Sequence, residues 1–120
     1  MNTQQLGAAI HETLNAHPSA TDTTELAELV KLALRGLGWG LLVPLDRSTI
    51  PWFTVGLRPF VVVELATSRE PDGVLLARLR AYRSHPQVAG CVLIDLREGG
   101  STVTLDGKPL VTVPYRLAVR

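Results

Sequence analysis

One carboxylate in this sequence needs a chemical explanation. Glu64 follows three consecutive valines, in a segment that is apolar on both faces, and a carboxylate in such a segment is costly to bury without a partner. In one interpretation Glu64 pairs with an arginine such as Arg69, or caps a neighbouring loop. In the other it faces a cleft at the sheet edge and binds a divalent cation, because Mg²⁺ takes hard oxygen ligands. Glu64 is therefore the candidate catalytic and metal-binding residue.

Four arginines are the candidate nucleic-acid-binding residues. They are Arg69, Arg78, Arg80 and Arg83. Arg80 and Arg83 are three residues apart on a predicted helix, so their side chains share a face, and the second half of the chain has a modest excess of basic residues. Such a face would contact a phosphate backbone. The alternative is a solvated helix face opposite the apolar positions.

The remaining residue types do not assemble a recognisable site. Cys91 is the single cysteine, so an internal disulfide and a thiolate metal cluster are excluded, and we expect it to be a buried small hydrophobe. The histidines His11, His17 and His85 lack metal-ligand spacing. We therefore expect no cofactor, with Mg²⁺ or Mn²⁺ implicated only if the chain is a nuclease.

Length and composition restrict the class of protein. The chain has 120 residues, 46% hydrophobic and 19% charged, with a formal net charge of +1, which predicts one compact domain over residues 1–120 rather than disorder. The apolar runs are too short for a membrane span and the N-terminus does not resemble a secretory signal, so we expect a cytoplasmic protein. The small net charge argues against strong nonspecific nucleic-acid binding.

Apolar periodicity predicts three helices. The first covers residues 6–14 and stops before Pro18, and the second covers residues 26–37, with Asp22 and Glu25 as a capping box and glycines at its end. The third is indicated by residues 75–82, with Asp72 as N-cap and Pro86 as the stop.

Segments with strand-like patterns surround the third helix. They are residues 41–45, 52–57, 60–66, 91–94, 102–105 and 110–113. The third helix would connect two parallel strands as a right-handed crossover, and residues 60–66 would lie in the middle of the sheet. Asp106-Gly107 predicts a tight hairpin within residues 101–115. The fold class is therefore α/β, in the order α-α-β-β-β-α-β-β-β.

This order resembles a known family. The matching stretches lie within about residues 5–96 and are residues 6–12, 25–38, 61–65 (Val-Val-Val-Glu-Leu), 79–82 (Leu-Arg-Ala-Tyr) and 92–94. They resemble the PD-(D/E)xK nuclease superfamily, and more closely its small bacterial GxxExxY proteins. The resemblance implies a restriction-endonuclease-like α-β-β-β-α-β core, with a mixed central sheet flanked by helices and followed here by the predicted C-terminal β-hairpin.

The resemblance also implies that the catalytic set is incomplete. Glu64 occupies the family's glutamate position, but the lysine position is Ala66, the upstream acidic position falls near Gly56, and the glutamine of the last helix is Arg78. The GxxExxY motif itself is not intact. Losing one electrostatic donor typically costs about 100-fold to 1,000-fold in rate, so a hydrolytic nuclease is not expected.

Three functions remain open at this point. The first is a catalytically degenerate nuclease-fold protein that acts as a binding or regulatory module, with a protein partner or weakly with nucleic acid, and with no membrane. The second is a metal-dependent DNA or RNA endonuclease whose ligands have migrated to Asp46, Glu70 or Asp72, with Arg69 in place of the lysine. The third is a self-associating structural module, for example a dimer formed through the terminal hairpin.

Overall fold

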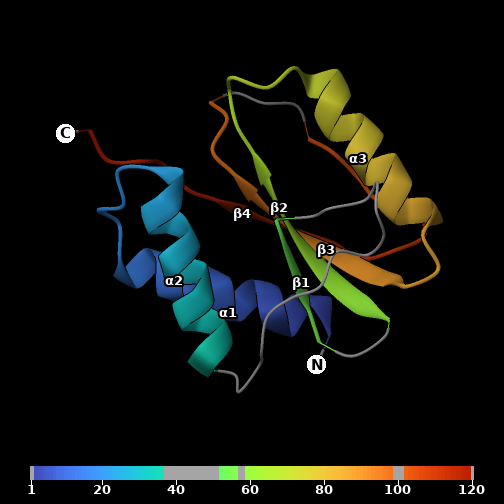
Figure 1. Ribbon diagram of the computed structural model, residues 1–120, viewed down its shortest axis with the longest axis horizontal. Helices are drawn as coiled ribbons and strands as arrows, with labels where there is room; N and C mark the ends of the chain where they lie inside the picture. Colours follow the sequence, from blue (N-terminus) through green and yellow to red (C-terminus); the bar gives the residue numbers. More distant parts are fainter. Residues whose placement is uncertain (1, 37–51, 57–58, 99–101, 120) are drawn as a thin grey trace.

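A computed structural model describes residues 2–36, 52–56, 59–98 and 102–119 of the chain (Figure 1). Its elements, in chain order, are α1 (Thr3–Ala16), α2 (Thr23–Gly36), β1 (Phe53–Val55), β2 (Phe60–Ala66), α3 (Asp72–Ser84), β3 (Val88–Asp95) and β4 (Leu110–Pro114). The three predicted helices are present, and the α/β class is confirmed. The predicted strand over residues 41–45, like Asp46, lies outside the described residues.

The described strands form one mixed sheet in the order β1-β2-β3-β4. β1 is antiparallel to β2, whereas β2, β3 and β4 run parallel to one another. α3 connects β2 to β3, as the crossover prediction requires. Because β2 is hydrogen-bonded on both sides and covered on both faces, its three valines are buried, which explains the continuous apolar pattern.

The predicted C-terminal hairpin is wrong. Residues 102–105 form no strand, and β4 pairs with β3 in parallel, with Leu110 opposite Cys91 and Pro114 opposite Asp95. The turn itself exists, since Lys108 N–H donates to the Leu105 carbonyl at 2.9 Å and Gly107 has a φ of +82°. Leu105 is buried in the core instead of facing a partner strand, so the turn leads the chain into β4.

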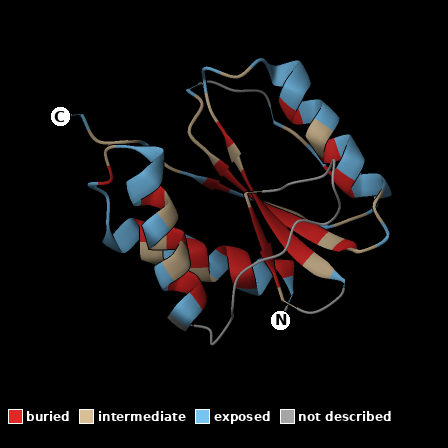
Figure 2. Cartoon of the chain, in the orientation of Figure 1, coloured by how far each residue is buried: buried red, intermediate tan, exposed pale blue. Residues whose placement is uncertain are grey.

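The sheet separates two apolar cores (Figure 2). α1 and α2 cover one face, where Val61 and Val63 of β2 point, and α3 covers the other, where Val62 and Ala66 point (Figure 1). The segment between β3 and β4 shares the α3 face, through Leu105. Successive side chains of β2 therefore point alternately into the two cores, and this alternation places Glu64 on the α3 side.

Two helix starts differ in detail from their predictions. Asp22 accepts the Glu25 N–H at 2.8 Å as predicted, but the Glu25 carboxylate accepts the Thr21 N–H at 2.7 Å and so reaches one residue further back. At α3 the N-cap is Pro71, without a side-chain cap bond, rather than Asp72. Asp72 is the first residue of the helix instead of its N-cap, and its carboxylate forms an ion pair with Arg97.

Lys108 ties the segment before β4 to the end of α3. Its Nζ donates to the carbonyls of Tyr82 at 2.9 Å and His85 at 2.7 Å. These carbonyls belong to the last turn and the C-cap of the helix, where a cation is favourable. Partial burial lowers the pKa of Lys108. This contact attaches the C-terminal end of α3 to the segment before β4.

α1 approaches the sheet so closely that glycine is required where they meet. A Cβ added to Gly90 on β3 would lie 2.9 Å from the Pro109 carbonyl oxygen and closer still to the Thr3 hydroxyl of α1. Gly7 on α1 faces Val111 of β4 in the same tight way. The packing of α1 on β3 and β4 therefore depends on glycine at positions 7 and 90, because neither glycine has a Cβ.

This close approach predicts the effect of a single methyl group. We expect Gly90→Ala to lower the free energy of unfolding by about 1 to 3 kcal/mol, since overpacking forces backbone shifts. Gly73→Ala in α3 is the matched control. A Cβ there meets nothing within 4 Å, and it should stabilise by about 0.5 kcal/mol. Urea denaturation measures both, and equal stabilities for Gly90→Ala and the wild type would contradict the packing.

Candidate functional site

Glu64 lies in the middle of the sheet and faces α3. Its exposed fraction is 5%, and its neighbours on the same face of β2 are Val62 and Ala66, which are buried. The register places it opposite Leu93 of β3. A carboxylate at this position cannot rely on water, so its polar partners must come from the protein.

Those partners come from α3 and from the backbone of β2. The Tyr82 hydroxyl donates a hydrogen bond to Oε2 of Glu64, and the Leu65 N–H lies 3.0 Å from Oε1. Arg78 Nε lies 3.6 Å from Oε2 as an ion pair. The arginine expected by the structural interpretation is therefore present, but it is Arg78 and not Arg69.

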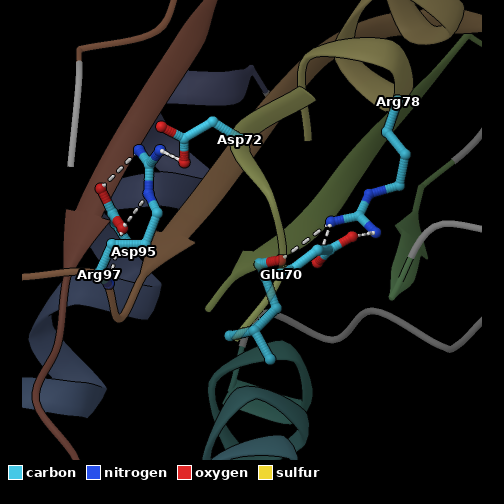
Figure 3. A network of polar contacts seen from close by, with 6 residues as sticks. Glu70, Asp72, Arg78, Asp95 and Arg97 are labelled. Carbon is cyan, nitrogen blue, oxygen red and sulfur yellow. Dashed lines mark hydrogen bonds and ion pairs between the residues drawn. The ribbon is translucent and has the colours of Figure 1, made fainter. Parts of the chain in front are cut away.

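Arg78 connects Glu64 to a second carboxylate. Its Nη1 and Nη2 both donate to Glu70, with Nη2 at 2.9 Å from Oε2, and Nη2 also lies 3.4 Å from the Leu65 carbonyl (Figure 3). Nε is buried and, within the described part of the chain, makes no hydrogen bond. The guanidinium thus lies between two acids, one from β2 and one from the loop that follows it.

Helical spacing on α3 brings these groups together. Arg78 and Tyr82 are four residues apart, so they share one side of the helix. Leu75, Leu79 and Tyr82 are the buried residues of α3, and they hold this side against β2. The arginine and the tyrosine therefore reach Glu64 from a single surface that packing has already oriented.

Burial and charge reinforce the protonation states of this cluster. Burial, together with the negative charge of Glu64, raises the pKa of Tyr82 far above its usual range. The same two causes raise the pKa of the Cys91 thiol. For Arg78, burial alone would lower the pKa, but the hydrogen bond to Glu70 and the charges of Glu64 and Glu70 raise it. Tyr82 remains a donor and Arg78 remains a cation.

A second arginine cluster lies beside the first at the end of β3. The Arg97 side chain is only 6% exposed; its Nε lies 3.0 Å from Asp95 Oδ1 and its Nη1 lies 3.3 Å from Asp72 Oδ1 (Figure 3). Arg97 was not a sequence candidate. Its position two residues after Asp95 was visible in the sequence, but its contact with Asp72, 25 residues earlier, was not.

The residues around Glu64 do not fit a divalent cation. A tyrosine hydroxyl, a backbone N–H and a guanidinium, all donors, surround its carboxylate, whereas a metal needs further oxygen ligands. Ala66, where the resemblance would require a lysine, is buried, and Gly56, near the position where it would require an acid, follows β1 with a φ of +97°. Across the described ranges, no three His, Cys, Asp or Glu residues gather in a group suited to a metal.

Two of the four candidate nucleic-acid-binding arginines are held in ion pairs. Arg78 is held between Glu64 and Glu70, and Arg83 pairs with Asp106 at 3.3 Å. Arg69 and Arg80 are exposed, but Arg69 is in the loop after β2 and Arg80 is on α3. The predicted row on the helix is therefore reduced by ion pairing.

Comparisons with family models, with curated proteins and with solved structures find no match in any of the three. Among the described residues, no helix is both long and apolar enough to cross a membrane.

The Glu64 cluster predicts a measurable cost for losing one hydroxyl. Tyr82→Phe removes the donor to Glu64 and leaves a buried acceptor with fewer partners, so we expect the free energy of unfolding at neutral pH to fall by about 1 to 3 kcal/mol. Tyr115→Phe is a control in a less buried place. Its hydroxyl donates to the His17 carbonyl at 2.7 Å and accepts the Ala20 N–H at 3.2 Å. Because these partners are reached by water more readily than the buried Glu64 carboxylate, the loss of this hydroxyl should cost less.

The raised pKa of Tyr82 sets how this cost changes with pH. In the unfolded chain Tyr82 ionises near its ordinary pKa of 10, whereas the folded state keeps the proton. Above pH 10 the folded state thus holds more protons, and stability falls as pH rises. Tyr82→Phe lacks this loss, so the stability difference between wild type and variant should shrink above pH 10. A constant difference in urea denaturation would contradict the assignment.

Proposed function

We propose that this chain is a nuclease-like protein that has lost catalysis and acts by binding. The observation that carries the proposal is the position of Arg78. Its guanidinium lies between the carboxylates of Glu64 and Glu70, where an active relative of the resembled family would need a divalent cation. A permanent internal cation in this position occupies the space between the two carboxylates and offsets one of their two negative charges, so a metal ion has less to gain by binding there.

The chain order supports the kinship but does not establish it. β1 and β2 are antiparallel, α3 follows, and β3 returns parallel to β2. This β-β-α-β sequence is the last part of the expected core, and Glu64 occupies the strand before the helix. Arg78 and Tyr82 then lie on the helix that the resemblance assigns to the site.

The energetics favour the arginine over a metal. Removing Arg78 would leave Glu64 buried without its cation, and breaking such a pair is strongly unfavourable. Entry of a metal would require the same pair to open. Because Glu70 and the Leu65 carbonyl also bind the guanidinium, a metal would compete against several contacts at once.

The correction at the C-terminus weakens the self-association alternative. That alternative relied on an exposed hairpin, whereas Leu105 is buried in the core with Val103 packed against it, and β4 ends in Pro114. α3 instead presents Val74, 44% exposed, and Leu76, 39% exposed. Val74 and Leu76 are two residues apart, so they lie on different sides of the helix, and β4, at the edge of the described sheet, stays the place where the self-association alternative would pair two chains.

The proposal predicts an absence of metal-dependent cleavage. We expect the wild-type chain to leave plasmid DNA and RNA intact with millimolar Mg²⁺ or Mn²⁺, because no vacant oxygen site is available next to Glu64. The measurement is gel electrophoresis after prolonged incubation, with Glu64→Gln as the matched variant. Cleavage by the wild type that disappears in Glu64→Gln would establish the nuclease alternative instead.

The same arrangement predicts that removing the internal cation creates a place for an external one. We expect Mn²⁺ to leave the Tm of the wild type unchanged and to raise that of Arg78→Met, in which Glu64 and Glu70 have lost their shared cation. The double variant Arg78→Met with Glu70→Gln is the control and should not respond. Equal responses of the single and double variants would show that the two acids do not form a cation site.

A further inference from the structure

β4 lies at one edge of the described sheet, and within the described residues it pairs with β3 only. A strand at an open edge presents a row of unpaired backbone groups. The sequence of β4, Leu-Val-Thr-Val-Pro, contains no charged residue, although charge on an edge strand is a common way of preventing pairing with another chain. β4 is therefore the part of the sheet to which a further strand can be added.

Two hydrogen bonds show which backbone groups of β4 point outward. The Cys91 N–H donates to the Pro109 carbonyl at 3.0 Å, and the Tyr115 N–H donates to the Asp95 carbonyl at 3.0 Å. Backbone direction alternates along a strand, and the register between β3 and β4 is continuous. The odd-numbered residues of β4 thus bond to β3, and the even-numbered residues direct their N–H and C=O groups away from the sheet.

These outward groups are available for pairing. Across the described ranges, the N–H groups of Leu110 and Thr112 make no hydrogen bond, and Thr112 is exposed. Pro114 has no N–H, but it is the last residue of β4, so it removes a donor only at the end of the strand. The edge therefore offers both backbone groups of Leu110 and Thr112, and the carbonyl of Pro114.

This set of donors and acceptors is complementary to itself. When two β4 strands lie antiparallel about a twofold axis at Thr112, the two copies of Thr112 exchange N–H to C=O hydrogen bonds. Two residues away, the Leu110 N–H of one copy donates to the Pro114 carbonyl of the other. Only the Leu110 carbonyl finds no donor, because it faces the proline nitrogen. The same edge thus serves both copies, as a closed twofold interface requires.

The side chains fit the same arrangement. The two copies of Thr112 lie directly opposite each other, and threonine pairs of this kind are favourable. On the face covered by α1, Val111 of one copy lies opposite Val113 of the other. Val113 is buried in the core, and Val111 is half-buried against it. A second β4 strand therefore extends this apolar row and covers Val111 further.

The basic residues that flank β4 already have partners in their own chain. Lys108 donates to the carbonyls of Tyr82 and His85, and Arg116 forms an ion pair with Glu98. In the antiparallel arrangement Lys108 of one copy comes nearest to Arg116 of the other. Because both cations are engaged within their own chains, the repulsion between these like charges is reduced.

We propose that two copies of this chain form a dimer by antiparallel pairing of their β4 strands about Thr112. The two sheets join into one sheet that crosses the dimer axis. This assignment goes beyond the proposed loss of catalysis, since the pairing uses none of the residues around Glu64.

Analytical ultracentrifugation over a range of protein concentrations tests the dimer. Thr112→Pro removes the outward N–H and leaves the hydrogen bonds to β3 in place. We expect the wild type to dimerise, and Thr112→Pro to dimerise at least about tenfold more weakly, because symmetry removes two hydrogen bonds at once. Thr112→Val is the matched control. It keeps the N–H and a β-branched side chain, so it should dimerise as the wild type does.

A second variant tests the same contact without changing the backbone. Thr112→Lys places two ammonium groups opposite each other at the twofold axis, where like charges repel. We expect this variant to dimerise more weakly than the wild type at low salt, and to recover part of its affinity at high salt because salt screens the repulsion. Ultracentrifugation at the two salt concentrations measures the difference.

Amide hydrogen exchange of the wild type identifies the paired strand. The amides of Leu110 and Thr112 should exchange more slowly as the protein concentration rises, whereas those of Val111 and Val113 bond to β3 in either state. A monomer at every concentration, a dimer with unchanged exchange at Leu110 and Thr112, or undiminished dimerisation of both Thr112→Pro and Thr112→Lys would each overturn the proposal. Cleavage of nucleic acid is assayed separately, so these outcomes leave the proposed loss of catalysis unaffected.

Discussion

The central constraint on this structure is the need to solvate one carboxylate inside the sheet. Glu64 is 5% exposed and lies among valines and an alanine on the α3 side of β2. Burial without partners would cost several kcal/mol, so the polar groups of α3 must lie directly over it. Tyr82 and Arg78 meet this need, and they thereby fix the rotation of α3 on the sheet. The apolar side chains of the helix define its buried side, and the polar pair defines its register.

The same contacts extend from the sheet to the loop after β2. Arg78 binds Glu70 as well as Glu64, and Arg97 binds Asp72 at the start of α3. Two buried or half-buried arginines thus attach one short loop to both the helix and the neighbouring strand. Ion pairs of this kind contribute little where water screens them, but the low exposure of Arg97 makes its geometry specific. The loop after β2 is thereby attached both to α3 and to the end of β3.

Local sequence patterns predicted much of the fold. The errors arise where the structure depends on contacts between residues that are far apart in the sequence. The stripe of α2 and the apolar run of β2 depend on neighbours a few residues away, and both are confirmed. Asp106-Gly107 correctly indicates a turn, but a turn signal does not say which strand pairs with the next one. Asp72 is typical of an N-cap, but the helix already begins at Asp72, whose carboxylate pairs with the distant Arg97. The four-residue spacing of Arg78 and Tyr82 was visible, but their shared acid was identifiable only after β2 and α3 were placed together.

An internal guanidinium and a bound metal satisfy a pair of acids in different ways. A metal is supplied from solution, exchanges, and leaves a coordination position for water or substrate, which is the basis of its chemistry. Arg78 is covalently part of the chain, stays charged, and fills its own contacts with Glu64, Glu70 and the Leu65 carbonyl. Under the proposed function, Glu64 has a structural reason to remain even though Ala66 stands where the resembled family has a lysine. Once the arginine and tyrosine cover the acid, its removal would leave the buried Nε of Arg78 and the buried Tyr82 hydroxyl without their shared acceptor, so the acid remains necessary after catalysis is lost.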